Sequence, residues 1–127
     1  MNETDFLRSC FNRAKHSVEA HIFGKKAVGY RFFLFSTISG RREYYRYFEE
    51  APIMEAGQYG WCETKDSKIF IGVQDKLPEG DLIGTLIHEI LHGLYPNESE
   101  ENIRKMESYC CDRDNIEREN LLEELNR

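Results

Sequence analysis

Two histidines and a glutamate in the second half of the chain have the types and the spacing of a metal-dependent catalytic site. They form the run His88-Glu89-Ile90-Leu91-His92. Histidines four positions apart on a helix project from the same face, one turn apart, so both imidazoles can reach one metal ion. Zinc suits such a pair, because it binds neutral imidazole and keeps one position open for water. The run therefore predicts Zn²⁺ bound by His88 and His92, with Glu89 as the general base that deprotonates the attacking water.

The surroundings of this run strengthen the prediction. By residue frequencies alone, the five-residue pattern occurs by chance in roughly one in a few hundred chains of this length. Here it lies in a strongly apolar stretch, DLIGTLIHEILHGL, where ionisable side chains without partners are costly to bury. Small residues, Gly84 and Thr85, precede His88 by about one turn and leave room above its ring. The alternative is an ordinary helix whose histidines bind no metal.

An open zinc site needs a third protein ligand, and the other histidines are poorly placed to supply it. His16 and His21 lie near the N-terminus, and no histidine follows His92. A downstream carboxylate is the remaining choice. The candidates are Glu98, Glu100, Glu101 and Glu107.

These four carboxylates differ in placement. Glu98 takes the position of the third histidine in the pattern HExxHxxGxxH, but Tyr95 replaces the glycine that this tight turn uses. Glu100 and Glu101 open the next expected helix, and a helix N-terminus favours a carboxylate. Counted at 100° per residue, Glu100 falls nearer than Glu101 to the apolar face of that helix, and Glu107 also lies near this face. The residues alone leave the choice open.

The part of the chain around the motif resembles a known family. The stretch from Gly60 to Met106 is similar to small zincin-like metallopeptidases that are often encoded by bacteriophages and prophages. The resemblance rests on the pattern TxxHExxH, which ends at His92, followed by a proline turn and the acidic pair Glu100-Glu101. It implies a zincin-like fold, cleavage of a peptide or amide bond in a protein or peptide substrate, and a third ligand from the acidic pair. Within that pair it favours Glu101, with Glu100 as the close alternative.

The apolar patterning predicts an α+β fold around the motif. A stripe of apolar side chains predicts a helix over roughly residues 4–20, and apolar residues on most sides of 81–94 predict a buried helix. β-Branched and aromatic residues predict one hairpin over 28–50 and a second that ends in a strand at 68–73. A further helix is expected from about 100 to 110, and the charged tail from Asp112 is expected to be solvated or frayed. These elements predict a small, mostly antiparallel sheet packed on an N-terminal helix, the HExxH helix and a C-terminal helix.

The resemblance also suggests where a substrate would lie. Zincin-like folds place an edge strand before the catalytic helix, and the matching segment here is KIFIGV at 68–73. An extended peptide pairs with the free backbone groups of such a strand. Residues 1–55 resemble no known family, so nothing about substrate specificity follows from the resemblance.

Length and composition set the remaining expectations. A chain of 127 residues is the size of a single domain, here 1–127, and its formal net charge of −6 disfavours a nucleic-acid partner. Without a membrane-spanning apolar run or a signal-peptide pattern, no membrane partner is expected and the expected location is the cytoplasm, that of the host if the chain is phage-encoded. The four cysteines are then expected to be free thiols: Cys10, Cys62, Cys110 and Cys111.

A second hypothesis is a non-catalytic binding protein, such as a phage factor that engages a host protein with a metal-stabilised scaffold. The aromatic and basic stretch from Lys25 to Phe48 would then be the binding surface. Glu89 argues for the hydrolase, because a purely structural metal has no chemical need for a carboxylate beside its first histidine.

The motif predicts the metal content of the purified protein. We expect about one equivalent of zinc per chain, because two imidazoles and a carboxylate form a three-ligand open site. His88→Ala and His92→Ala should each lose the metal. Elemental analysis measures it, and full zinc retention in both variants would place the metal elsewhere.

Overall fold

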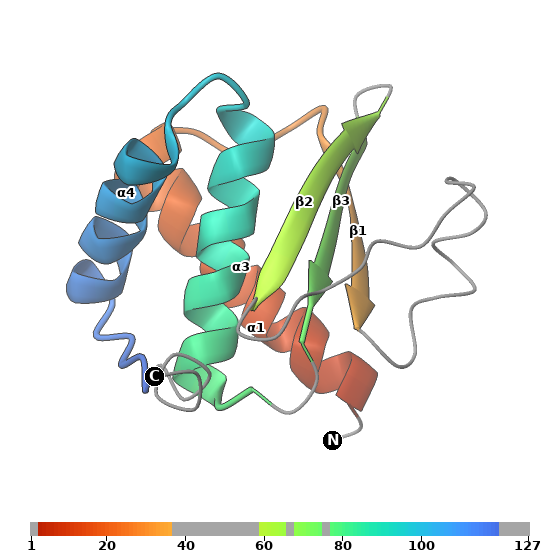
Figure 1. Ribbon diagram of the computed structural model, residues 1–127, viewed down its shortest axis with the longest axis vertical. Coiled ribbons are helices and arrows are strands. Elements are labelled where there is room, and N and C mark those ends of the chain that lie inside the picture. Colours follow the sequence, from red (N-terminus) through yellow and green to blue (C-terminus); the bar gives the residue numbers. More distant parts are fainter. Residues whose placement is uncertain (1–2, 37–58, 66–67, 75–76, 120–127) are drawn as a thin grey trace.

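The computed structural model describes residues 3–36, 59–65, 68–74 and 77–119. These residues form an α+β fold in which a sheet, α3 and α4 follow one another in layers and α1 packs on α3 (Figure 1). The α+β part of the expected fold is thus confirmed. In chain order the elements are α1 (Glu3–Val18), the π-helical turn η1 (Glu19–Phe23), β1 (Arg31–Ser36), β2 (Gly60–Lys65), β3 (Lys68–Val73), α3 (Glu79–Leu94) and α4 (Glu100–Arg113).

The three strands form one mixed sheet in the order β1-β3-β2. β3 runs antiparallel to β2, with Cys62 opposite Ile71, so the predicted hairpin of these two strands is confirmed. β3 runs parallel to β1, with Phe33 opposite Phe70. The expected, mostly antiparallel sheet is therefore corrected to a mixed one. The second strand of the hairpin predicted over 28–50 lies outside the described residues.

β3, predicted to be an edge strand, is the central strand of the described sheet. Its residues Ile69, Phe70, Ile71 and Val73 are buried, and it is paired on both sides. A strand covered on both faces carries a continuous apolar run, whereas a half-exposed strand alternates apolar and polar residues. KIFIGV is of the first kind, so its assignment as the edge was wrong. Among the described strands, β1 and β2 are the outer ones.

α1 is held on the core by a stripe of small and apolar side chains. Cys10, Ala14 and Val18 are four residues apart and at most 2% exposed. The helix continues as η1, and Gly24 ends it with a φ of 73°, a left-handed conformation that glycine adopts without strain. The helix predicted over 4–20 is therefore confirmed, as α1 and η1 together.

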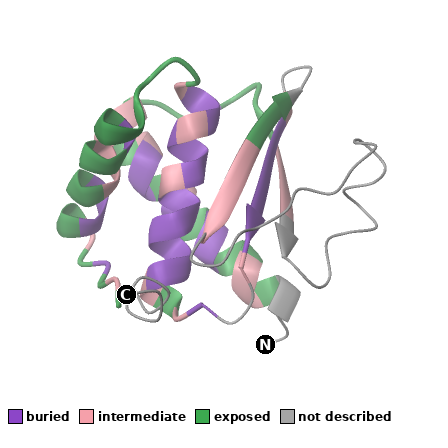
Figure 2. Ribbon diagram, viewed as in Figure 1, coloured by how far each residue is buried: buried purple, intermediate pink, exposed green. Residues whose placement is uncertain are grey.

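α3 lies at the centre of the layers and is buried along most of its length, whereas α4 exposes its outer side (Figure 2). The buried residues of α3 include three polar ones, Asp81, Thr85 and Glu89. Such groups need partners inside the fold, because burying them unpaired costs several kcal/mol, on the order of 2–7 for a neutral polar group. No helix in the described part of the chain has both the length and the apolar content to cross a membrane.

Residues 116–119, called the C-terminal strap below, pack against α3. Ile116 is buried, and the backbone N–H of Glu119 donates to Oδ1 of the buried Asp81 at 2.8 Å. The tail from Asp112, expected to be solvated or frayed, is exposed at Asp112 and Glu117, but the expectation is wrong for Ile116 and Arg118, which pack against α3. Residues 120–127 lie outside the described part.

Two glycines of α3 make room for the strap. A Cβ atom at Gly80 would lie 1.7 Å from the carbonyl oxygen of Glu117. At Gly84 it would lie 2.6 Å from Cδ of Arg118. The two glycines are one turn apart and open the same side of the helix. The strap therefore lies directly on the backbone of α3.

A third glycine of α3 sets the distance of the helix from the sheet and generates a stability prediction. A Cβ atom at Gly93 would lie 2.6 Å from Cγ2 and 3.0 Å from Cδ1 of Ile69. Alanine usually favours a helix interior by about 1 kcal/mol over glycine, but here the collision opposes this gain. We expect Gly93→Ala to lower the urea midpoint of the metal-free protein.

The control is the same substitution in an Ile69→Ala background. The colliding atoms are then gone, so Gly93→Ala should be neutral or stabilising there. Urea unfolding of the four proteins in the presence of a chelator measures the coupling. Equal effects of Gly93→Ala in both backgrounds would contradict the close packing of α3 on β3.

Candidate metal centre

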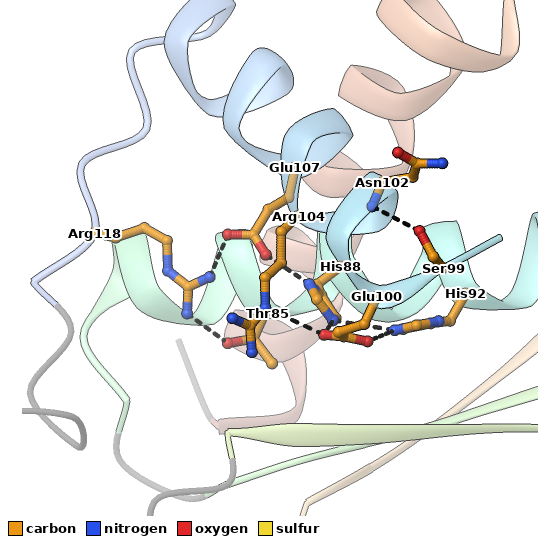
Figure 3. Close-up of polar contacts among 9 residues, drawn as sticks. All are labelled: Thr85, His88, His92, Ser99, Glu100, Asn102, Arg104, Glu107 and Arg118. Atoms are coloured by element: carbon orange, nitrogen blue, oxygen red, sulfur yellow. Dashed lines mark hydrogen bonds and ion pairs between the residues drawn. The ribbon is translucent and has the colours of Figure 1, made fainter. Parts of the chain in front are cut away.

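Three potential metal ligands meet where α4 begins beside α3. His88 and His92 project from α3, and Glu100, the first residue of α4, points back between them (Figure 3). Ser99 fixes the start of α4, because its Oγ accepts a hydrogen bond from the backbone N–H of Asn102 at 3.2 Å. This N-cap holds Glu100 in the first turn, opposite the two histidines.

The ligand atoms converge to distances close to those around a bound ion. His88 Nε2 lies 2.8 Å from Glu100 Oε1, and His92 Nε2 lies 2.7 Å from Glu100 Oε2. The two Nε2 atoms are 3.1 Å apart. Ligand atoms around a tetrahedral zinc ion with bonds of about 2.0–2.1 Å are about 3.3 Å apart. A small outward movement of these side chains would therefore accommodate zinc.

The close approach of His88 to Glu100 is favourable only with a metal ion or a further proton between them. His88 Nδ1 lies 2.8 Å from Glu107 Oε1. Because an ionised carboxylate only accepts hydrogen bonds, Nδ1 carries the hydrogen, and the neutral ring then presents Nε2 as an acceptor. That acceptor faces an oxygen of Glu100. Two acceptors in contact repel each other unless a metal ion or a further proton lies between them, so the group is suited to hold a metal.

The pKa values show the same preference for positive charge. Burial alone would lower the pKa of His88, but the hydrogen bond to Glu107 and the charges of Glu89, Glu107 and Glu100 outweigh it and raise the pKa. Burial would likewise raise the pKa of Glu100, yet His88 and His92 hold it below its usual value. The site thus stabilises a positive charge beside three carboxylates.

Glu89 lies deeper than the three ligands and is 5% exposed. Burial raises its pKa to about 7; the charge of His88 opposes this shift, and the carboxylates of Glu100 and Glu107 add to it. β2 begins close to it, since a Cβ atom at Gly60 would lie 3.4 Å from Glu89 Cγ. A carboxylate whose pKa is near neutrality is suited to take up and release a proton during a reaction.

The site opens into a cleft of about 1000 Å³. Residues of β2, α3, α4 and the strap line it, and α3 lies between β2 and α4 (Figure 1). His88, Glu89, His92 and Glu100 all line this one cleft. The potential metal ligands and the carboxylate expected to act as base therefore face the same space.

Of the carboxylates considered as third ligand, the structure brings Glu100 to both histidines. Glu101 is 80% exposed and pairs with Lys105 at 3.5 Å, and Glu98 accepts a hydrogen bond from a side-chain amide of α4. Helix geometry explains the difference: Glu100 shares a face with Glu107, two turns on, whereas Glu101 is turned away by 100°. Glu100, the alternative of the pair, therefore replaces Glu101 as the preferred third ligand.

Glu107 and Arg118 form a layer behind His88. Glu107 contacts Nδ1 of His88 and so lies on the side of the ring away from the other ligands. Its second oxygen accepts from Nη1 of Arg118 at 2.5 Å. Sequence reasoning missed Arg118, which lies in a densely charged tail. The only signal was the pair Gly80 and Gly84, because two glycines one turn apart in an apolar helix indicate a close approach by another segment.

The cysteines carry no reactive signature. All four are free, as expected. Cys62 and Cys111 line the cleft, but burial, aided by the charges of Glu89 and Glu107 respectively, raises the pKa of each thiol to about 12. Thiols rather than thiolates are therefore present near neutral pH, and thiols are weak nucleophiles and weak metal ligands.

No family model matches the chain, and comparisons with curated proteins and with solved structures found no match either. The resemblance to zincin-like metallopeptidases therefore stays an expectation drawn from the sequence. The case for a function rests on the geometry of the site itself.

The different placement of the acidic pair generates a prediction on metal affinity. Glu100→Gln should weaken zinc binding by about 100-fold or more, since losing a direct ligand should cost at least as much as losing an outer-shell partner, roughly 10–100-fold. Glu101→Gln, the matched control one residue away, should bind zinc as the wild type does. Competition against a chromophoric chelator measures both. Loss of zinc affinity in Glu101→Gln alone would instead identify Glu101 as the third ligand.

Proposed function

We propose that the protein is a zinc-dependent hydrolase, with His88, His92 and Glu100 as metal ligands and Glu89 as the general base. The observation that carries the proposal is the convergence of two imidazoles and one carboxylate on one point, with a buried carboxylate of raised pKa in the same cleft. A protein or peptide is the proposed substrate, and the bond cleaved is a peptide or amide bond. The cytoplasm, where free thiols persist, is the proposed location.

The chain's own residues divide the chemistry between them. A bound zinc ion would polarise the substrate carbonyl and acidify a water molecule in the open coordination position. Glu89 takes the proton from the attacking water and passes it to the leaving amine. In the metal-free site burial raises the pKa of Glu89 to about 7, a value suited to both transfers, because a base that is too weak would not accept the proton and one too strong would not release it.

The cleft has room for an extended, polymeric substrate as well as for a small molecule. Its volume of about 1000 Å³ lies at the upper end of the range of roughly 300–1000 Å³ that small-molecule pockets occupy. It is bounded on one side by β2, an outer strand of the described sheet. An extended chain segment would run along this strand and place one of its carbonyl groups at the ligand cluster.

The test of the proposal is Glu89→Gln. The substitution keeps the shape of the side chain but removes the basic site, so zinc content should be unchanged while turnover falls roughly 100-fold or more. The substrate probe is a proteome-derived peptide library, and mass spectrometry counts the newly formed peptide termini. Glu101→Gln is the matched control, because it makes the same chemical change at an exposed position.

Two outcomes separate the hypotheses. Cleavages made by the wild type and Glu101→Gln but not by Glu89→Gln support the hydrolase and reveal its sequence preference. If wild type and Glu89→Gln contain equal zinc and produce the same termini as a protein-free blank, the site has no peptidase activity, and the metal-stabilised binding protein becomes the better account.

A further inference from the structure

Arg118 is the point at which the C-terminal strap meets the metal centre. Its Nη1 donates to Glu107 Oε2 at 2.5 Å, and its Nη2 donates to Thr85 Oγ1 at 3.2 Å (Figure 3). Its Nε lies 3.7 Å from Asp81 Oδ1, and the guanidinium lies over the ring of Tyr59, 5.2 Å from the centroid. One side chain thus joins α3, α4 and the segment that leads into β2.

The charges around Arg118 are poorly solvated. The side chain of Asp81 is fully buried, and those of Glu107 and Arg118 are 13% and 19% exposed. Buried carboxylates require a well-placed cation. Arginine can serve both at once, because its planar fork presents several donors in fixed directions, whereas the lysine ammonium is a single point charge.

Glu107 is held at both ends of its carboxylate group. Oε1 contacts Nδ1 of His88, and Oε2 contacts Nη1 of Arg118. A carboxylate fixed by two partners has a defined plane, and that plane sets the direction of the imidazole ring. Outer-shell contacts of this kind select the tautomer of a ligating histidine and orient its metal-binding nitrogen.

The side chain of Arg118 lies directly against the backbone of α3. A Cβ atom at Gly84 would lie 2.6 Å from Cδ and 2.9 Å from Nε of Arg118, so the stem of the side chain rests on the helix backbone. The glycine thus determines how far the guanidinium reaches along α3. Any larger residue at this position displaces it.

We propose that Arg118 is a positioning residue of the metal centre: it holds Glu107, which in turn holds His88 with Nε2 directed at the metal position. The inference rests on the zinc site of the proposed function and adds to it a dependence on the C-terminal strap. The strap is then part of the functional site although none of its residues is a proposed ligand or base.

The first test compares two arginine-to-lysine substitutions. Arg118→Lys keeps the positive charge beside Asp81 and Glu107 but cannot make the three contacts together, so zinc affinity should fall by about tenfold or more, the range of outer-shell substitutions. Arg113→Lys is the matched control, because Arg113 stacks on the ring of Tyr109 outside the cleft. It should bind zinc within about twofold of the wild type, the spread expected for a surface change.

Two further variants test the route through Glu107. Gly84→Ala displaces Arg118 without changing any charge and should lower zinc affinity similarly, although alanine favours the helix itself. Glu107→Gln should also weaken zinc binding. In the Glu107→Gln background, Arg118→Lys should add little, because both substitutions interrupt the same chain of contacts. Additive losses would show that Arg118 does not act through Glu107 and would overturn the proposed route.

Two readouts separate positioning from a merely structural role. The first is thermal unfolding of the metal-free proteins. If Arg118→Lys and Gly84→Ala lower the melting temperature but bind zinc as tightly as the wild type while folded, the strap is only structural and the inference fails. The second is the imidazole nitrogen NMR spectrum of the metal-free protein at alkaline pH. The wild type should show His88 with hydrogen on Nδ1, and Arg118→Lys should show a mixture of tautomers.

The NMR readout also distinguishes failure of this inference from failure of the proposed function. A wild type that binds no zinc overturns the proposed metal centre. In that case a change of the His88 tautomer in Arg118→Lys still supports the positioning of His88 by Arg118. An unchanged tautomer overturns it.

Discussion

Ionisable groups buried along α3 constrain the rest of the structure. Glu89 and Asp81 lie on a helix that is covered by the sheet, by α1 and by α4. A buried carboxylate is tolerated only with a cation or hydrogen-bond donors nearby. The elements that cover α3 therefore bury its apolar residues and also supply partners for its polar ones.

α4 and the C-terminal strap supply the partners for the polar residues of α3. α4 brings Glu100 to the histidines and Glu107 to the rear of His88, and the strap brings Arg118 between Glu107 and Asp81. Acidic and basic groups therefore alternate from Asp81 through Arg118 and Glu107 to His88 at the cleft. A metal ion held by His88, His92 and Glu100 would continue this alternation. Binding at such a place couples metal affinity to the stability of the fold, because the ligands come from two helices that must be docked.

The arrangement of the sheet bears on how a substrate would approach. Because β3 is central, its backbone is paired on both sides, and β2 is the strand that lines the cleft. Gly60 lets β2 begin close to Glu89 and Thr85, since any side chain there would collide with Thr85. The wall along which we propose that a peptide lies and the carboxylate proposed as base are thus held together by one close contact.

Local patterns in the sequence determined the helix that carries the motif, the shared face of His88 and His92, the stripe of α1 and the hairpin of β2 and β3. Each depends on side-chain periodicity or turn residues within a short window, where backbone geometry alone decides the outcome. Tertiary structure decided the parallel pairing of β1 with β3, the selection of Glu100 over Glu101, and the role of Arg118. These features depend on how segments far apart in the chain pack, and the strap lies on α3 through close contacts such as that of Arg118 at Gly84, which no local pattern encodes.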